Sequence, residues 1–369
     1  MATRTYTQEE LVALGVPSSL LTEHMKTHPP PPPFEVVSDM NGMRKARIVH
    51  LETRRPDFPI PGAIPDLVEE NDVYVDYPPQ NCKIQVRVYA PVDLGEAARS
   101  SGLPMIVLMH EGGFMLGDIS DEEHNARLFA SSFDCIVLNV EYLLAPEHPF
   151  PIGVKSCYHV LEALASSPKT FHSLANPSQG LILGGSSAGG NLSAVLAHHA
   201  RQQKLSIPVT GQWLGVPFIA TAELIPEKFK QMFQSQSLRV DPVLDPGEDE
   251  ATNHKLFEVC QVKDPSDPLI TPFSPALYPP NSANNDPSLP KLAKAFIQAG
   301  GLDPLRDHAI VYARALEEDW NTDVRLLVYG GYGHMFWTNW PLLEESKRFW
   351  KDTVKGFEWL LGQQAKREW

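Results

Sequence analysis

The sequence lacks the features that mark secreted and membrane proteins. Its 4 cysteines form no Cys-x-x-Cys pair, so we expect reduced, structural thiols and no disulfide framework. No apolar run approaches the length of a membrane span. The N-terminus has no apolar core of a signal peptide, and Lys366-Arg367-Glu368-Trp369 is no retrieval or peroxisomal signal. These absences predict a cytoplasmic protein without a membrane span, and leave monomer and homodimer both open.

Basic residues are also scarce. The 31 lysines and arginines stand against 45 aspartates and glutamates, which gives a net charge of −14. Such a balance argues against nucleic acid and anionic membranes as partners. No motif implies a metal or an organic cofactor. The 369 residues are 43% hydrophobic and 21% charged, an ordinary globular composition with enough length for a sizeable core.

The first 72 residues differ from the rest of the chain. Residues 8–15 suit a short helix, and the run from Pro29 to Pro33 predicts extended polyproline II. Apolar side chains in this segment favour an arm that packs on a folded body: Leu11, Leu14, Leu20, Leu21 and Phe34.

Strand-like and helix-like patterns alternate from residue 73 onward. Val73–Tyr77 and Lys83–Ala90 predict an antiparallel hairpin at a sheet edge. Near-continuous apolar runs then predict buried parallel strands at Met105–Met109, Cys135–Val140, Leu181–Leu183, Val209–Val216, Ala295–Ala299 and Val324–Tyr329. Helical patterns lie between or after them at Glu122–Ser132, Val154–Ser166, Asn191–Gln203, Asp307–Glu318 and Pro341–Leu361. The alternation predicts an α/β fold with a mostly parallel, doubly wound sheet.

One interval is too long for a normal crossover between two strands. Residues 219–290 are rich in Pro, Asp, Gln and Asn, and Glu227–Gln236 is amphipathic. We interpret this interval as a cap or lid over the active-site end of the sheet. The predicted division is therefore an N-terminal arm or cap segment at 1–72, a core at 73–218 and 291–369, and a cap insertion at 219–290.

A nucleophile elbow is the most informative local pattern. Gly185-Ser186-Ser187-Ala188-Gly189 follows the apolar run Leu181–Leu183 and precedes the helix-like run Asn191–His199. A Gly-x-Ser-x-Gly turn between a strand and a helix presents one serine at the tip of a sharp bend. The two glycines flank Ser187 at the required spacing, whereas a motif centred on Ser186 would need glycine at 188. Ser187 is the predicted nucleophile.

A serine hydroxyl needs a base, and the base needs an orienting carboxylate. His334 lies in the glycine-rich loop after the last predicted strand, and Asp303 follows the strand Ala295–Ala299. Asp303 would also serve as a helix cap, and Asp307 is the alternative carboxylate. The order Ser187, Asp303, His334 is typical of α/β-hydrolases.

The oxyanion of a tetrahedral intermediate needs preorganised N–H donors. Gly112 and Gly113 follow the strand Met105–Met109 and bring backbone close to a ligand without a side chain in the way. The N–H of Ala188, at the start of a helix, is the third predicted donor.

The chain resembles the hormone-sensitive-lipase-like α/β-hydrolases, which include carboxylesterases and arylacetamide deacetylases. The resemblance covers about residues 73–362 and implies an α/β-hydrolase fold with a helical cap, with Gly112, Gly113 and Ala188 as the oxyanion donors. Its motifs are His110-Glu111-Gly112-Gly113-Phe114, the run from Glu141 to Pro151, Gly185-Ser186-Ser187-Ala188-Gly189-Gly190-Asn191, Asp303-Pro304-Leu305-Arg306-Asp307 and Gly333-His334.

The chain departs from the pattern of the family at four positions. Glu111 replaces a glycine, Ser186 an aspartate, Leu143 an arginine and Met335 a glycine. A carboxylate beside the oxyanion hole would repel the developing anion unless a cation neutralises it. A glutamate at the position of Glu111 resembles fungal-type members of the family. This resemblance favours a Glu111 carboxylate that is paired with a cation.

Three functions are compatible with these residues. The first is a serine hydrolase that cleaves a carboxylic ester of a small apolar or aromatic molecule through an acyl-enzyme. The second is a non-hydrolytic tailoring enzyme of secondary metabolism, such as a dehydratase, cyclase or acyl transferase. The third is a small-molecule receptor, which the presence of His334 disfavours. Candidate substrate-binding residues are Glu111, Phe114, Tyr142, Phe218 and Trp337.

Overall fold

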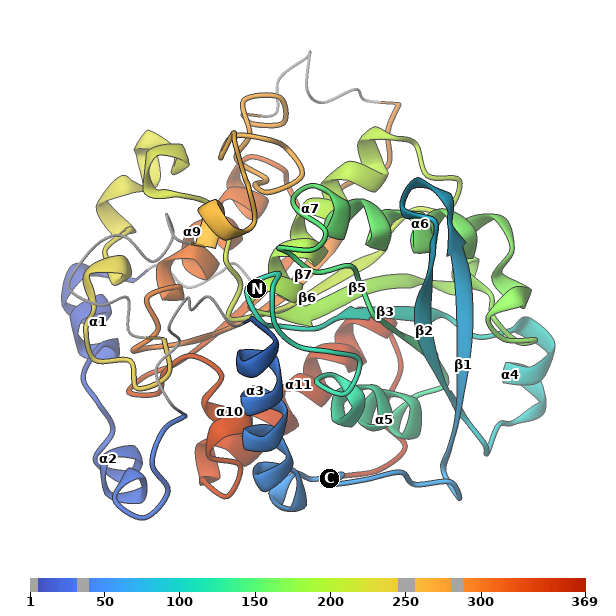
Figure 1. Cartoon of the computed structure of the whole chain (residues 1–369), viewed down its shortest axis with the longest axis horizontal. Helices are drawn as coiled ribbons and strands as arrows, with labels where there is room; N and C mark the ends of the chain where they lie inside the picture. Colours follow the sequence, from blue (N-terminus) through green and yellow to red (C-terminus); the bar gives the residue numbers. More distant parts are fainter. Residues whose placement is uncertain (1–5, 32–39, 245–255, 280–287) are drawn as a thin grey trace.

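Eight strands form one sheet in the order β1-β2-β4-β3-β5-β6-β7-β8 (Figure 1). The computed structural model describes residues 6–31, 40–244, 256–279 and 288–369. The strands are β1 (Val68–Tyr77), β2 (Cys82–Pro91), β3 (Met105–Met109), β4 (Ile136–Val140), β5 (Leu181–Ser186), β6 (Gly211–Gly215), β7 (Lys294–Gly300) and β8 (Val324–Tyr329). Strands β1 and β2 are antiparallel to their neighbours and β3 to β8 are parallel, so the predicted doubly wound sheet is confirmed.

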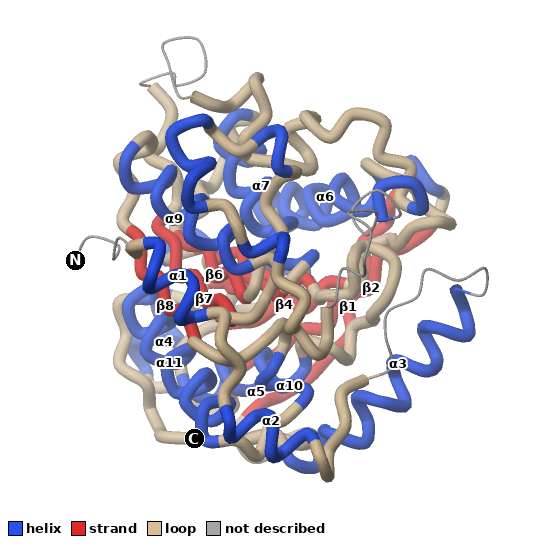
Figure 2. Tube along the Cα trace, turned by 90° about the vertical axis from the view of Figure 1, so that its left-hand side faces the viewer, coloured by secondary structure: helices blue, strands red, loops and turns tan. Residues whose placement is uncertain are grey.

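Helices cover both faces of the sheet (Figures 1 and 2). Helices α5 (Glu123–Ser132) and α11 (Glu344–Leu361) pack on one face, and α6 (Ile152–Ser166), α7 (Ala188–Gln202) and α9 (Arg306–Glu318) on the other. Two short helices, α4 (Glu96–Ser101) and α10 (Phe336–Asn339), complete the body. All residues of β3 and β4 are buried, as near-continuous apolar runs predict for a sheet covered on both faces. Within the described ranges, no helix is both long and apolar enough to cross a membrane.

The N-terminal segment is more helical than predicted. It contains α1 (Gln8–Leu14), the expected short helix, and two helices that were not expected, α2 (Ser19–Met25) and α3 (Met40–Arg54). The prediction that its leucines are buried holds for Leu11 and Leu21 but is wrong for Leu20, which is 65% exposed. Phe34 and the last two prolines of the polyproline run lie outside the described residues. The sheet begins at Val68 rather than Val73 because β1 pairs with β2 along its full length.

The long interval between β6 and β7 contains short 3-10 helices at Ala222–Leu224, Glu227–Met232 and Ser235–Ser237 in its described part. The predicted amphipathic piece is the second of these, and it buries Phe229. Other residues of the interval, among them Thr221, Phe233 and Leu244, line the cavity described below, so the interval lies at the carboxyl end of the parallel strands.

A buried arginine ties the N-terminal segment to the body. The Arg306 guanidinium donates to the carbonyls of Leu11 and Gly301, at 2.8 and 3.1 Å, and pairs with the carboxylate of Asp307 at 2.7 Å. Both side chains of the ion pair are almost fully buried. The contact holds α1 beside the loop that follows β7.

Replacing Arg306 with methionine is expected to lower the free energy of unfolding by about 3 kcal/mol, because one charge of a buried pair is left behind. Denaturant unfolding of Arg306→Met against the wild type measures the loss. The control is Lys347→Met, which removes an exposed pair with Glu344 and should leave stability unchanged. Equal stability of all three proteins would contradict the role given to Arg306.

Candidate active site

The elbow at the end of β5 is a strained, tightly packed turn. Ser187 has φ +53° and ψ −113°, outside the regions that non-glycine residues normally adopt. A Cβ at Gly189 would lie 1.8 Å from the carbonyl oxygen of Met109, and one at Gly185 would lie 2.1 Å from the same oxygen. Both positions must therefore be glycine. The Ser187 N–H donates to the carbonyl of Gly215 at 2.7 Å, which extends the β5–β6 pairing into the turn.

The structure brings Ser187, His334 and Asp303 together in one hydrogen-bonded chain. His334 Nε2 lies 3.0 Å from Ser187 Oγ, and His334 Nδ1 lies 2.7 Å from Asp303 Oδ2. The three residues follow β5, β8 and β7, whose carboxyl ends meet at one edge of the sheet. This is the geometry of a nucleophile, a base and an orienting carboxylate. The alternative, Asp307, instead accepts from two backbone N–H groups of the insertion, at Gln234 and Ser235.

Carboxylates outweigh burial at His334. Burial by itself would lower the pKa of the imidazole, but the nearby carboxylates of Asp303, Asp241 and Glu111 raise it above its ordinary 6.5. The imidazolium that forms when a base takes the proton of serine is therefore stabilised at this position.

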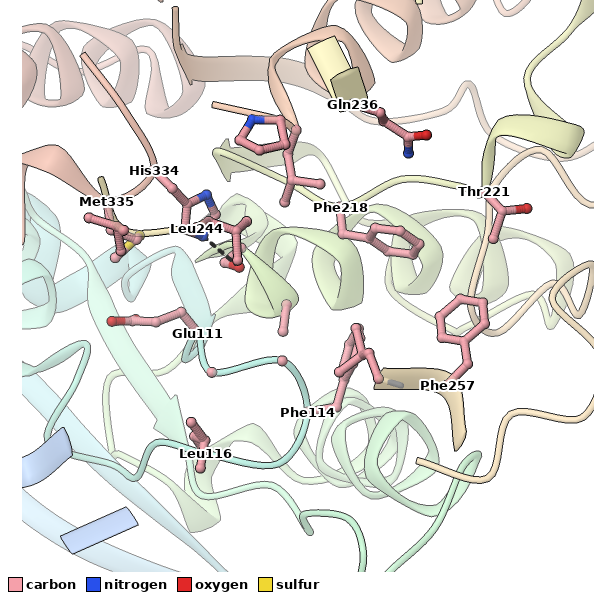
Figure 3. Close-up of a pocket in the computed structure, with 18 of the residues that line it drawn as sticks. Glu111, Phe114, Leu116, Phe218, Thr221, Gln236, Leu244, Phe257, His334 and Met335 are labelled. Atoms are coloured by element: carbon pink, nitrogen blue, oxygen red, sulfur yellow. Dashed lines mark hydrogen bonds between the residues drawn. The ribbon is translucent and has the colours of Figure 1, made fainter. Parts of the chain in front are cut away.

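A cavity of about 1400 Å³ opens above the elbow (Figure 3). Ser187 and His334 line it together with the three predicted oxyanion donors, Gly112, Gly113 and Ala188. The remaining lining comes from the N-terminal segment with α3, from the 219–290 insertion, from the loops after β3, β6, β7 and β8, and from α10.

Three of the five predicted substrate-binding residues line this cavity, namely Glu111, Phe114 and Phe218. The prediction was wrong for Tyr142 and Trp337. Tyr142 is buried against the ring of His110 and donates its hydroxyl to the carbonyl of His110. Trp337 is buried beneath the site and stacks on Phe349 with ring centroids 3.8 Å apart. Both aromatic rings pack in the core.

Glu111 is paired with a cation, as the resemblance favoured. Arg47 of α3 reaches Glu111 Oε1 at 2.7 Å and Asp121 Oδ1 at 2.5 Å. Burial, and then the neighbouring charge of Asp121, raise the pKa of Glu111 to about 7, while Arg47 opposes the rise. Because Arg47 belongs to the N-terminal segment, this segment neutralises a carboxylate beside the predicted oxyanion hole.

Sequence reasoning missed Arg47 and a second residue, Asp241 of the insertion. Asp241 is buried and accepts the backbone N–H of His334 at 2.5 Å. Both contacts join segments far apart in the chain, and neither residue lies in a recognisable motif. Among the residues that the structure describes, no group of three or more His, Cys, Asp and Glu side chains is arranged to hold a metal ion.

Comparison with known proteins shows the family of the chain. The model of a family described as alpha/beta hydrolase fold matches residues 106–338. A Schizosaccharomyces pombe protein named AB hydrolase superfamily protein is 32% identical over 83% of this chain and 84% of its own length. The chain belongs to the hormone-sensitive-lipase-like α/β-hydrolases.

Two further similarities come from named enzymes. The carboxylesterase NlhH of Mycobacterium tuberculosis is 30% identical over 74% of this chain and 75% of its own length. A solved vibralactone cyclase superposes with a TM-score of 0.80 at 25% identity, and covers 98% of this chain and 99% of its own. Members with two named chemistries thus share the α/β-hydrolase architecture of this chain.

Removing Arg47 is expected to make stability depend more steeply on pH. The folded-state pKa of Glu111 is about 7 against an ordinary 4.5, so the fold favours the protonated form and loses stability as pH rises from about 4.5 to about 7. Arg47→Met removes the positive charge that stabilises the ionised form of Glu111. The thermal midpoint of the variant should therefore fall more, relative to the wild type, at about pH 8 than at about pH 5.

The matched control is Arg44→Met on the same helix. Arg44 pairs with the half-exposed Glu147, and its hydrogen bond, together with its charge, lowers the pKa of that carboxyl. Glu147 is therefore ionised at both pH values, and the loss caused by Arg44→Met should be the same at each. An equal loss for Arg47→Met at the two pH values would contradict the assignment of Glu111.

The reactivity of Ser187 is expected to follow the protonation of His334. Because the imidazole must be neutral to act as a base, fluorophosphonate labelling of the serine should slow as pH falls through a pKa above 6.5. The measurement is the labelling rate of the wild type across pH. A midpoint below 6.5 would show that the carboxylates around His334 do not control it.

Proposed function

We propose that the protein hydrolyses carboxylic esters of apolar or aromatic molecules through an acyl-enzyme on Ser187. The observation that carries the proposal is the Ser187–His334–Asp303 chain, with links of 3.0 and 2.7 Å, at the floor of a largely apolar cavity. Family membership and the carboxylesterase-like relatives support it.

In the first step, Ser187 Oγ attacks the ester carbonyl carbon while His334 Nε2 takes the hydroxyl proton. Asp303 holds the imidazole through Nδ1, so that Nε2 faces the serine. The carbonyl oxygen becomes an anion, and we assign the backbone N–H groups of Gly112, Gly113 and Ala188 as its donors, since all three residues line the cavity.

Collapse of the tetrahedral intermediate breaks the bond to the alcohol, whose oxygen takes the proton from His334. Water then enters, gives a proton to His334 and attacks the acyl carbon. The second intermediate expels Ser187 Oγ, which recovers its proton, and the carboxylic acid leaves. The resulting carboxylate would meet the carboxyl of Glu111 in the same cavity.

The walls of the cavity favour an apolar substrate. Phe114, Phe218 and Phe257 form an aromatic group on one side, where Phe218 and Phe257 meet edge to face with centroids 5.9 Å apart (Figure 3). Helix α3 closes another side through Met43 and Leu51. We propose that residues 1–72 and 219–290 act as the cap that selects the substrate, over the core at 73–218 and 291–369.

A cyclase is the second candidate, because the vibralactone cyclase similarity extends over nearly the whole chain. In such a reaction a nucleophile of the substrate, rather than water, would attack the acyl carbon and release Ser187 Oγ as a cyclic product forms. Product analysis separates the two functions, since hydrolysis of an ester in ¹⁸O-labelled water places the label in the acid and cyclisation does not.

The experiment is a panel of p-nitrophenyl esters with acetyl to dodecanoyl and benzoyl groups, assayed with the wild type and Ser187→Ala. Turnover should be measurable for the wild type, and Ser187→Ala should lose about 10³-fold or more in kcat because the nucleophile is gone. Full activity of Ser187→Ala on these esters would overturn the proposed mechanism.

A matched control is Ser186→Ala at the neighbouring position. The Ser186 side chain is buried in β5 and does not line the cavity, so this variant should keep most of the wild-type activity. If only hydroxylated substrates turn over, and without uptake of water, the cyclase replaces the esterase as the favoured function.

A further inference from the structure

Asp241 lies in the insertion between β6 and β7 and touches the loop that bears His334. Its side chain is 3% exposed. Oδ2 accepts the backbone N–H of His334 at 2.5 Å, and Oδ1 accepts the N–H groups of Val243 and Leu244 at 2.7 and 2.8 Å. One carboxylate thus bonds the histidine loop with one oxygen and a segment of the cavity wall with the other.

We propose that Asp241 is a positioning residue, which fixes the backbone of His334 and couples the cavity wall at Val243 and Leu244 to the catalytic base. The inference rests on the proposed function, because it gives His334 the role of base. The observation that supports it is the set of hydrogen bonds made by the single buried carboxylate of Asp241.

The absence of a side chain at Gly333 leaves space for the Asp241 carboxyl group. A Cβ at this position would lie 2.6 to 3.0 Å from three atoms, and all three belong to the Asp241 carboxyl group. Real Cβ atoms do not come so close to other atoms, so a side chain at 333 would expel Asp241. The glycine that precedes the histidine therefore makes room for the carboxylate.

The histidine loop has few side chains of its own to hold it. Gly330, Gly331 and Gly333 come before His334, and Met335 after it has φ +51°. Such a backbone has several accessible conformations and a high entropic cost of ordering. An acceptor from outside the loop, bonded to the N–H of His334 itself, fixes the conformation in which Nε2 faces Ser187.

The charge of Asp241 adds to this geometry. Three carboxylates face His334 from three segments: Asp303 after β7, Glu111 after β3 and Asp241 of the insertion, and each raises the pKa of the imidazole. Burial, and then the charge of Asp303, raise the pKa of Asp241 itself, while the three backbone N–H donors stabilise its ionised form.

The test is Asp241→Asn, which keeps the size of the side chain. Asparagine has one acceptor oxygen and would present an NH₂ group to either the His334 N–H or the turn, so one of the two links fails. We expect kcat on a short p-nitrophenyl ester to fall about 10-fold or more, with KM nearly unchanged, because the base is misplaced. The acid limb of fluorophosphonate labelling, which is the fall of the labelling rate as pH drops through the pKa of His334, should move to lower pH. The reason is that a carboxylate that raises this pKa is lost.

Asp267→Asn is the matched control. Asp267 lies in the same insertion, and its Oδ1 accepts the backbone N–H of Leu269 at 2.8 Å in a similar turn, but it does not line the cavity. This variant should keep the wild-type kcat and the wild-type acid limb. A purely structural effect of losing an aspartate turn would move both variants alike.

A double-mutant cycle keeps the proposal testable if Asp241→Asn folds poorly. Gly333→Ala should reduce kcat in the wild type, because the added methyl displaces the Asp241 carboxylate. It should cost much less in an Asp241→Ala background, where there is nothing to displace. Additive losses, or an Asp241→Asn variant with wild-type kcat and acid limb, would overturn the proposal.

Labelling separates this inference from the proposed function. If the wild type is labelled at Ser187 but turns over no ester, the proposed ester hydrolysis is contradicted. The labelling rates of Asp241→Asn and Asp267→Asn still decide whether Asp241 positions His334.

Discussion

The close packing of the elbow against the end of β3 is the constraint on which the rest of the site depends. Gly185 and Gly189 both approach the carbonyl of Met109 too closely for any side chain, and Ser187 keeps an unfavourable φ because the strands around it are paired. Since β3 continues directly into the loop of Gly112 and Gly113, the same contact sets the distance from the nucleophile to the N–H donors. The same packing in the core therefore places both the proposed nucleophile and the proposed oxyanion hole.

Charge is the second organising feature, and half of the charged residues come from outside the core. Glu111, Asp303 and Asp241 place three carboxylates around His334, and Arg47 of α3 neutralises the one nearest the predicted oxyanion hole. Two of these four residues belong to the N-terminal segment and the insertion. The segments that wall the cavity therefore also contribute charge beside His334.

The core strands, and the hydrogen-bonded group of Ser187, His334 and Asp303, were predictable because their signals are local. A buried strand is a short apolar run, and an elbow is a Gly-x-Ser-x-Gly turn at its end. Helix α3 was missed because none of its residues is fully buried. A helix without a core-facing apolar stripe gives only a weak periodic signal in the sequence. Arg47 and Asp241 were missed because their roles arise only from contacts with distant segments. Tyr142 and Trp337 were predicted to contact substrate but are buried in the core. The sequence does not distinguish the two locations, because an aromatic residue near a site motif can pack in the core or line a cavity.

The central claim is that Ser187 carries the acyl group during turnover. The direct measurement is peptide mapping by mass spectrometry after rapid acid quench of the enzyme with a p-nitrophenyl ester in excess. We expect the mass of the acyl group to appear on the peptide containing Ser187, and to disappear as substrate is exhausted. Turnover with no acyl mass on that peptide, or with the acyl group on another residue, would contradict it.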